Sequence, residues 1–207
     1  MLRLRRVLPL SLLLAGLVVW AVHLARQPEA GPEAVLPFAA IAPEVPPRAW
    51  RHIVVHHSAA EHGSSEGIDR FHHDDQGWEG IGYHFVIGNG HGMPAGRIEA
   101  TFRWRLQRHG AHVRVGAYNE TGIGICLIGN YNHEPPPSLL YERCAHLCAL
   151  LITSYPTLTV DRILGHRDAM ATDCPGDRFD LHHLRRRVEA LLPRYQRQQQ
   201  LSRDPGR

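Results

Sequence analysis

The chain shows two kinds of hydrophobic pattern: short continuous apolar runs, and longer segments whose apolar residues recur at helical intervals. The short runs predict buried β-strands at 51–57, 82–87, 123–128 and 162–165, and a weaker strand at 95–99 after a glycine-rich turn. The helical intervals predict helices at 64–76, 139–155 and 181–192. Because strands and helices are interleaved, the pattern predicts an α/β fold, with a central mixed β-sheet flanked by helices on both faces.

The first 26 residues predict a targeting segment. Three arginines within residues 1–6 precede an apolar run from Val7 to Val22, which is the pattern of a secretory signal. Because the run is almost long enough to span a bilayer, it predicts either a cleaved signal peptide or a retained membrane anchor. Both readings predict export to the periplasm or cell envelope, and the second adds association with the inner membrane.

The rest of the chain divides by composition. Residues 27–49 are rich in proline, alanine and glutamate without periodicity, which predicts an extended linker. Residues 50–195 contain the predicted strands and helices and form the expected domain, for which we expect a monomer. Residues 196–207 are polar, include a glutamine run and predict a flexible tail.

Composition narrows the chemistry. All 23 residues counted as lysine or arginine are arginine, which excludes lysine chemistry and favours carboxylate or phosphate ligands. A net charge of +3 is too small to indicate a nucleic-acid partner, and we expect none. The 16 histidines direct attention to metal binding and acid–base chemistry, because imidazole is the commonest metal ligand and titrates near neutrality.

Three residues are candidate metal ligands. His56 closes the first apolar run, and His166 directly follows the last one. Strand ends line the ligand crevice of open α/β sheets, and the irregular segment 165–180 can bring Cys174 back to His166. Two imidazoles and one thiolate suit a zinc ion (Zn²⁺) and leave its fourth position open, as in catalytic sites. Spacing alone leaves open the alternative that both histidines are hydrogen-bonded core or rim residues.

Five segments together resemble a known family: VVHHSA (54–59), GWEGIGYHFVI (77–87), GAHV (110–113), YNETGIGICLIGNYN (118–132) and GHRDAMATDCPGD (165–177). They resemble the zinc-dependent N-acetylmuramoyl-L-alanine amidases of the phage-lysozyme and peptidoglycan-recognition-protein superfamily, in matching order and spacing over about 51–192. The resemblance implies a type-2 amidase fold and hydrolysis of the amide bond between N-acetylmuramic acid and L-alanine. It also implies zinc as cofactor and peptidoglycan or muropeptides as partner.

The resemblance assigns roles to individual residues. His56, His166 and Cys174 would be the zinc ligands. Tyr83 matches a catalytic tyrosine that would stabilise the oxyanion or position water. Thr172 falls where relatives have lysine, threonine or serine, so it can form hydrogen bonds but cannot supply a positive charge.

Other polar residues are candidates for substrate binding. Four histidine and asparagine side chains are expected there: His57, His84, His112 and Asn119. His57, His84 or the zinc-bound water could move the proton to the leaving amine, and the sequence does not choose among them. Four arginines are a further hypothesis for binding stem-peptide carboxylates: Arg103, Arg105, Arg108 and Arg114. Asp168 or a backbone carbonyl is expected to orient His166.

The cysteines bear on the alternative function, a non-catalytic peptidoglycan-binding module. Relatives without activity typically lose the cysteine ligand, so the retained Cys174 favours the enzyme. Cys126 stands where cytoplasmic recycling amidases have a glutamate, which favours an exported enzyme. Cys126, Cys144 and Cys148 are read as small core residues, and a disulfide among them is left open.

Overall fold

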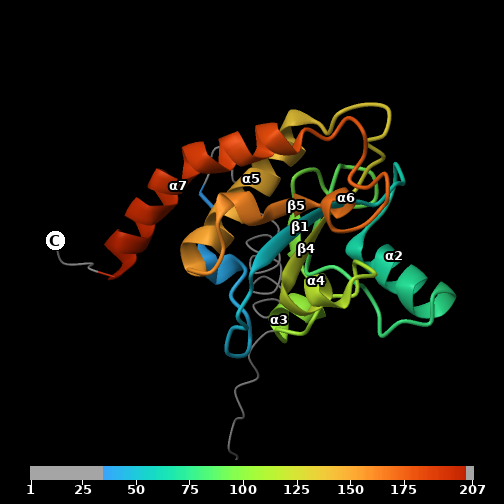
Figure 1. Cartoon of the computed structure of the whole chain (residues 1–207), viewed down its shortest axis with the longest axis horizontal. Coiled ribbons are helices and arrows are strands. Elements are labelled where there is room, and N and C mark those ends of the chain that lie inside the picture. The colour runs from blue at the N-terminus through green and yellow to red at the C-terminus, as the bar shows by residue number, and fades with distance from the viewer. Residues whose placement is uncertain (1–34, 204–207) are drawn as a thin grey trace, which may run out of the picture. The chain divides into compact units, whose positions relative to one another are not determined.

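The computed structural model describes residues 35–203, which form a five-stranded sheet with its helices (Figure 1). The strands are β1 (His52–His57), β2 (Phe85–Ile87), β3 (Ile98–Ala100), β4 (Gly122–Leu127) and β5 (Ile163–Gly165), in the order β3-β2-β4-β1-β5. β1 pairs in parallel with β4 and β5, β2 pairs in parallel with β4, and β3 is antiparallel to β2. The predicted mixed sheet is confirmed.

The three long helical predictions correspond to helices in the structure. α2 (Ser65–Arg70) continues into the π-helical turn η2 (Phe71–Asp75), and the other two are α5 (Ser138–Ser154) and α7 (Leu181–Arg203). The sequence missed five short elements: η1 (Phe38–Ala40), α3 (Phe102–Arg105), α4 (Gly116–Thr121), η3 (Val160–Arg162) and α6 (His166–Ala169). Each is too short to show a helical repeat of apolar residues, so periodicity cannot reveal it.

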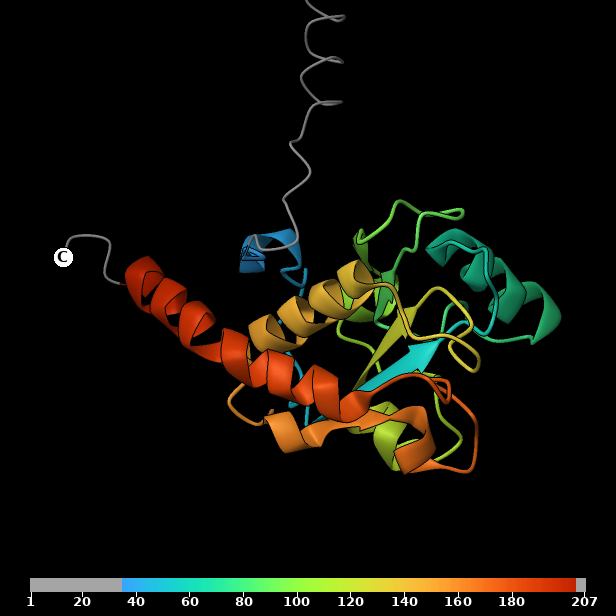
Figure 2. The same ribbon diagram turned by 90° about the horizontal axis from the view of Figure 1, so that it is seen from above.

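The two faces of the sheet have different surroundings. Alternate residues of a strand point to opposite faces, and Ile53 and Val55 of β1 join the main core with residues of β4, α5 and α7. Figures 1 and 2 show α5 and α7 lying side by side over the sheet. The intervening positions of β1 and β4 carry His56 and Cys126, which are partners in the strand register. The polar chemistry of the central strands is therefore on the face away from α5 and α7.

Part of the predicted linker packs on the domain. The side chains of Leu36 and Ile41 are buried in the main core. The backbone N–H of Leu36 donates to the hydroxyl of Tyr195 over 3.0 Å, and the indole N–H of Trp104 donates to the carbonyl of Ile41. The apolar residues within this proline-rich stretch are the sequence feature that indicates packing. Residues 35–49 are therefore part of the domain surface and not a free spacer.

The predicted flexible tail is also helical as far as Arg203. The predicted helix ends at residue 192, directly before Pro193, yet α7 continues through this proline, which lacks the N–H needed inside a helix. Tyr195 is buried against the core, and the side-chain amide of Gln199 donates to the carbonyl of Thr153 over 3.1 Å. Packing against α5 therefore compensates for the lost hydrogen bond.

The predicted targeting segment, residues 1–26, and residues 27–34 of the linker lie outside the described residues. Within residues 35–203, none of the helices combines the length and apolar character needed to cross a bilayer.

Candidate active site and metal centre

The three predicted ligands meet at one point. His56 comes from the end of β1, His166 begins α6, and Cys174 lies in the loop after α6. One ligand atom from each lies within 4.8 Å of the others. Nδ1 of His56 is 3.7 Å from Sγ of Cys174, and the His56 and His166 ring centroids are 4.5 Å apart.

These residues fit a zinc ion in geometry and chemistry. A tetrahedral ion with Zn–N near 2.0 Å and Zn–S near 2.3 Å holds its nitrogen and sulfur ligands about 3.5 Å apart, close to the observed 3.7 Å. Nε2 of His166 is buried and has no hydrogen-bond partner in the described part of the chain. A set of two imidazoles and one thiolate is typical of zinc, and three ligands leave one position open.

Burial sets the protonation of the ligand groups. It lowers the pKa of His56 well below its ordinary value and also lowers the pKa of His166, so both rings are in the neutral form that binds metal. Burial raises the pKa of Cys174 to about 12, against a hydrogen bond from the His57 backbone and the nearby charge of Arg167. Metal binding must therefore displace a proton from this thiol, which makes it more favourable as pH rises.

Backbone hydrogen bonds fix the loop that carries Cys174. The N–H of Arg167 donates to the Cys174 carbonyl over 2.9 Å, and the N–H of Cys174 donates to Oγ1 of Thr172 over 3.3 Å. Thr172 thus lies next to the ligand with its own O–H proton still available to donate. The carboxylate of Asp168, a candidate for orienting His166, instead accepts from the N–H of Gly165 over 2.9 Å and caps α6.

Tyr83 lies directly beside the ligand cluster. Its ring centroid is 5.0 Å from that of His56, and the thiol of Cys126 is close enough to affect its pKa. Burial raises the pKa of Tyr83 well above its usual value, so the phenol keeps its proton. Tyr83 can therefore act as a hydrogen-bond donor next to the metal position.

His84 does not reach the cavity, in contrast to the expectation that it binds substrate. It is completely buried: Nδ1 accepts from the N–H of Gly124 over 2.9 Å, and Nε2 donates to the carbonyl of Arg108 over 3.0 Å. Both ring nitrogens are used by the backbone, which leaves neither for substrate contact or proton transfer.

His57 is also committed to the fold. It follows His56 on β1, and its ring lies beside that of Tyr131 with centroids 6.1 Å apart. Its ring Nδ1 accepts the backbone N–H of Tyr131 over 3.1 Å, and the backbone N–H of His57 donates to Sγ of Cys174 over 3.4 Å. His57 therefore supports the Cys174 loop through Nδ1 and its backbone N–H, and contact of its Nε2 with substrate stays a prediction.

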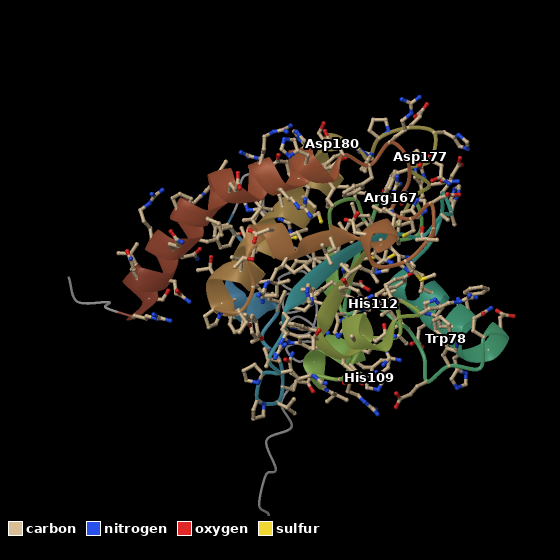
Figure 3. All side chains as sticks on the ribbon, viewed as in Figure 1. Trp78, His109, His112, Arg167, Asp177 and Asp180 are labelled. Carbon is tan, nitrogen blue, oxygen red and sulfur yellow. The ribbon has the colours of Figure 1, made fainter. Side chains whose placement is uncertain are left out.

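A cavity of about 420 Å³ adjoins the ligand cluster. Its lining residues are Trp78, Ala111, His112, Val113, Arg114, Asn119, His166 and Met170, and Figure 3 labels Trp78 and His112. Asn119 shapes this wall: Oδ1 accepts the N–H groups of His112 and Val113, and Nδ2 donates to the Val113 carbonyl. His112 and Asn119 thus lie at the predicted groove, and their contact with substrate stays a prediction. The sequence had not assigned Trp78 or Met170, although both stand in the segments that carry the resemblance.

Of the four arginines proposed to bind carboxylates, Arg114 alone lines this cavity. Arg103 is buried and donates to the backbone carbonyls of Ile81 and His109. Arg108 forms an ion pair with Glu79 over 2.6 Å, and Arg105 donates to the Ala100 carbonyl. The hypothesis is therefore corrected to Arg114, because the other three are engaged elsewhere.

The cysteines other than Cys174 are buried inside the domain. All four cysteines are free thiols, and Cys126, Cys144 and Cys148 are buried. Cys144 and Cys148 belong to the main core, as expected, whereas Cys126 is buried on the opposite face of the sheet, near Tyr83.

Fold and site together define an α/β domain with a candidate mononuclear metal site at the edge of a ligand-sized cavity. The chain belongs to the Amidase_2 family, described as N-acetylmuramoyl-L-alanine amidase, whose model matches residues 46–177. The family resemblance seen in the sequence is confirmed.

Known proteins agree with this assignment. The pig N-acetylmuramoyl-L-alanine amidase is 38% identical over 117 residues, 53% of this chain and 17% of the pig protein. The chain spans less than a fifth of the length of the mammalian relatives it matches. The endolysin amidase LysCS of Clostridium intestinale superposes with a TM-score of 0.59 at 27% identity, over 68% of this chain and 84% of that one. A Drosophila PGRP-LB mutant in complex with tracheal cytotoxin superposes with a TM-score of 0.51 at 27% identity. The superposition covers 63% of this chain and 77% of the PGRP-LB chain.

Proposed function

We propose that this protein hydrolyses the amide bond between N-acetylmuramic acid and L-alanine in peptidoglycan or its fragments, and that zinc is its cofactor. The convergence of His56, His166 and Cys174 within 4.8 Å, in a chain whose family is named for this activity, carries the proposal. A zinc ion bound there would supply a Lewis acid that polarises a carbonyl and lowers the pKa of water.

The protein groups supply the remaining catalysis. Tyr83 keeps its proton, and it donates to the carbonyl oxygen on which charge develops during attack. A donor of this kind typically contributes about 3–4 kcal/mol of barrier lowering. Thr172 adds a second hydroxyl beside the Cys174 ligand. Both nitrogens of His84 bind the backbone, so the proton for the leaving amine comes from the attacking water or from Nε2 of His57, whose Nδ1 alone is occupied.

The cavity suits a sugar–peptide substrate. Trp78, Val113 and Met170 provide apolar surface, and Arg114 provides a positive charge. This combination fits a ligand that carries both carbon-rich groups and carboxylates. The related PGRP-LB domain was solved with tracheal cytotoxin, which supports a muropeptide ligand for this chain.

The second candidate is a peptidoglycan-binding module without activity, which the PGRP relatives support. Such a module would use the same cavity but would not need a complete ligand set. The presence of all three ligands and Tyr83 favours the enzyme.

We also propose that the protein is exported to the periplasm or cell envelope. The basic and apolar pattern of residues 1–22 supports this proposal and leaves cleavage or anchoring to experiment. Fractionation of expressing cells, with N-terminal sequencing of the mature chain, distinguishes the two.

The central experiment incubates the full chain with purified cell-wall sacculi and analyses the products by mass spectrometry. The expected products are stem peptides with a free L-alanine amine and glycan strands whose lactyl groups end in a newly formed carboxylate. Chelation should abolish cleavage, and added zinc should restore it. Binding to sacculi without cleavage would identify a recognition module, and cleavage that survives exhaustive chelation would refute the zinc mechanism.

A further inference from the structure

The second ring nitrogen of His56 takes part in a buried chain of hydrogen bonds. Nε2 of His56 lies 3.1 Å from Nδ1 of His112, and Nε2 of His112 lies 3.3 Å from the carbonyl oxygen of Gly122. The His56 and His112 rings meet edge to face, with centroids 5.0 Å apart. These hydrogen bonds connect the β4 backbone to the ligand cluster.

The donor and acceptor in each of these hydrogen bonds follow from the Gly122 carbonyl, which can only accept a hydrogen bond. Nε2 of His112 must therefore carry the proton that it donates, and Nδ1 of a neutral His112 is then a bare acceptor. That acceptor takes the Nε2 proton of His56, and Nδ1 of His56 is left without a proton. This bare atom is the one 3.7 Å from Sγ of Cys174.

The fold holds the His112 ring in a slot that requires glycine on both sides. A Cβ at Gly124 would lie 2.5 Å from Cδ2 of His112, and a Cβ at Gly110 would lie closer still. Asn119 fixes the other end of the residue by accepting the His112 backbone N–H over 2.9 Å. The ring is thus positioned by the β4 backbone, two glycines and an asparagine.

We propose that His112 is a positioning residue for the metal: it fixes the tautomer and orientation of His56, so that Nδ1 of His56 faces the metal position. This inference rests on the proposed function, because it presumes that the cluster binds zinc. It differs from the role that the sequence suggested for His112, which was contact with substrate. Outer partners of metal-bound histidines typically contribute about 10–100-fold in metal affinity.

The test measures zinc affinity of the full chain by competition with a chromophoric chelator. His112→Leu removes the acceptor and should weaken zinc binding about 10–100-fold. His112→Asn places its Oδ1 near the former Nδ1, so its affinity should stay close to wild type. His146→Leu is the matched control, because His146 is also a buried histidine but contacts Tyr195 between α5 and α7.

Nitrogen-15 NMR of the zinc-free wild type supplies a readout that needs no variant. His56 should show the tautomer protonated at Nε2, and the opposite tautomer would overturn the inference. Equal zinc affinity of His112→Leu and wild type, with a raised KM, would also overturn it and identify His112 as a substrate contact. A wild type that binds no zinc would instead refute the proposed function, together with this inference.

Discussion

Nδ1 of His56 lies 3.7 Å from Sγ of Cys174, although 118 residues separate them along the chain. The parallel pairing of β1 with β5 produces this contact. Val55 is the register partner of Gly165, so His56 and His166 leave neighbouring strands at the same edge of the sheet. The short loop after α6 then returns Cys174 to the same point. The candidate metal site is thus a consequence of sheet topology.

Cys174→Ser should abolish zinc-dependent cleavage without unfolding the domain. A neutral hydroxyl is a much poorer zinc ligand than a thiolate, so zinc affinity should fall beyond the roughly 10–100-fold of an outer partner. Calorimetric titration with zinc and mass spectrometry of treated sacculi measure the two effects. Binding of muropeptide should remain, because Cys174 does not line the cavity. Full activity in this variant would exclude the proposed ligand set.

Tyr83→Phe should lower kcat about 10²–10³-fold, the usual effect of losing one oxyanion donor. Zinc affinity and KM should change little, because the phenol is not a ligand and the ring is retained. Cys126→Ala is the matched control: it removes the buried thiol beside the phenol but leaves the phenol in place. An equal loss in both variants would show that activity depends on the packing around the phenol and not on the Tyr83 donor itself.

The elements that build the site were predictable from sequence because they are continuous apolar runs ending in unusual polar residues. β1 and β4 are buried along almost their whole length. Because both faces of these strands are covered, apolar and polar residues do not alternate, and the sequence shows an unbroken apolar run. A histidine at the end of such a run costs solvation free energy unless it has a partner. For His56 and His166 this reasoning located the candidate metal site.

The roles of His84, His57 and Arg103 could not be predicted, because their partners are backbone groups. Arg103 donates to the carbonyls of Ile81 and His109, and a carbonyl has no signature in the sequence. An arginine side chain can bind a ligand when it faces a cavity, and it supports the fold when it faces the backbone of a loop. That difference depends on tertiary packing, which also decides where short helices such as α4 form.

Arg114→Ala should raise KM for muropeptides that carry free carboxylates and leave kcat nearly unchanged. A charge-assisted hydrogen bond contributes about 1.5–3 kcal/mol, which corresponds to a tenfold or larger change in affinity. Arg105→Ala is the matched control, because Arg105 is an exposed arginine that pairs with Glu44 over 3.7 Å away from the cavity lining. The same KM in Arg114→Ala and wild type, with amidated and free stem peptides alike, would contradict the assignment.

Acid should destabilise the zinc-free protein through its buried neutral histidines. Burial lowers the pKa of His84 well below 6.5, and neighbouring His112, Arg103 and Arg48 act in the same direction. The unfolded chain therefore binds protons near pH 6.5 that folded His84 does not bind. Stability is fully present above pH 6.5 and is lost as pH falls towards the folded pKa. Each unit of pKa difference corresponds to about 1.4 kcal/mol.

Urea unfolding of chelator-treated protein at pH 7.5 and pH 5 measures this loss as a lower midpoint in acid. His84→Asn separates the cause from general acid sensitivity. Its Oδ1 can still accept the N–H of Gly124, as Nδ1 of His84 does, but an amide does not titrate. The variant should be less stable at neutral pH, since it loses the bond to the Arg108 carbonyl, and should lose less stability on acidification. Parallel losses in His84→Asn and wild type would show that other groups control the acid response.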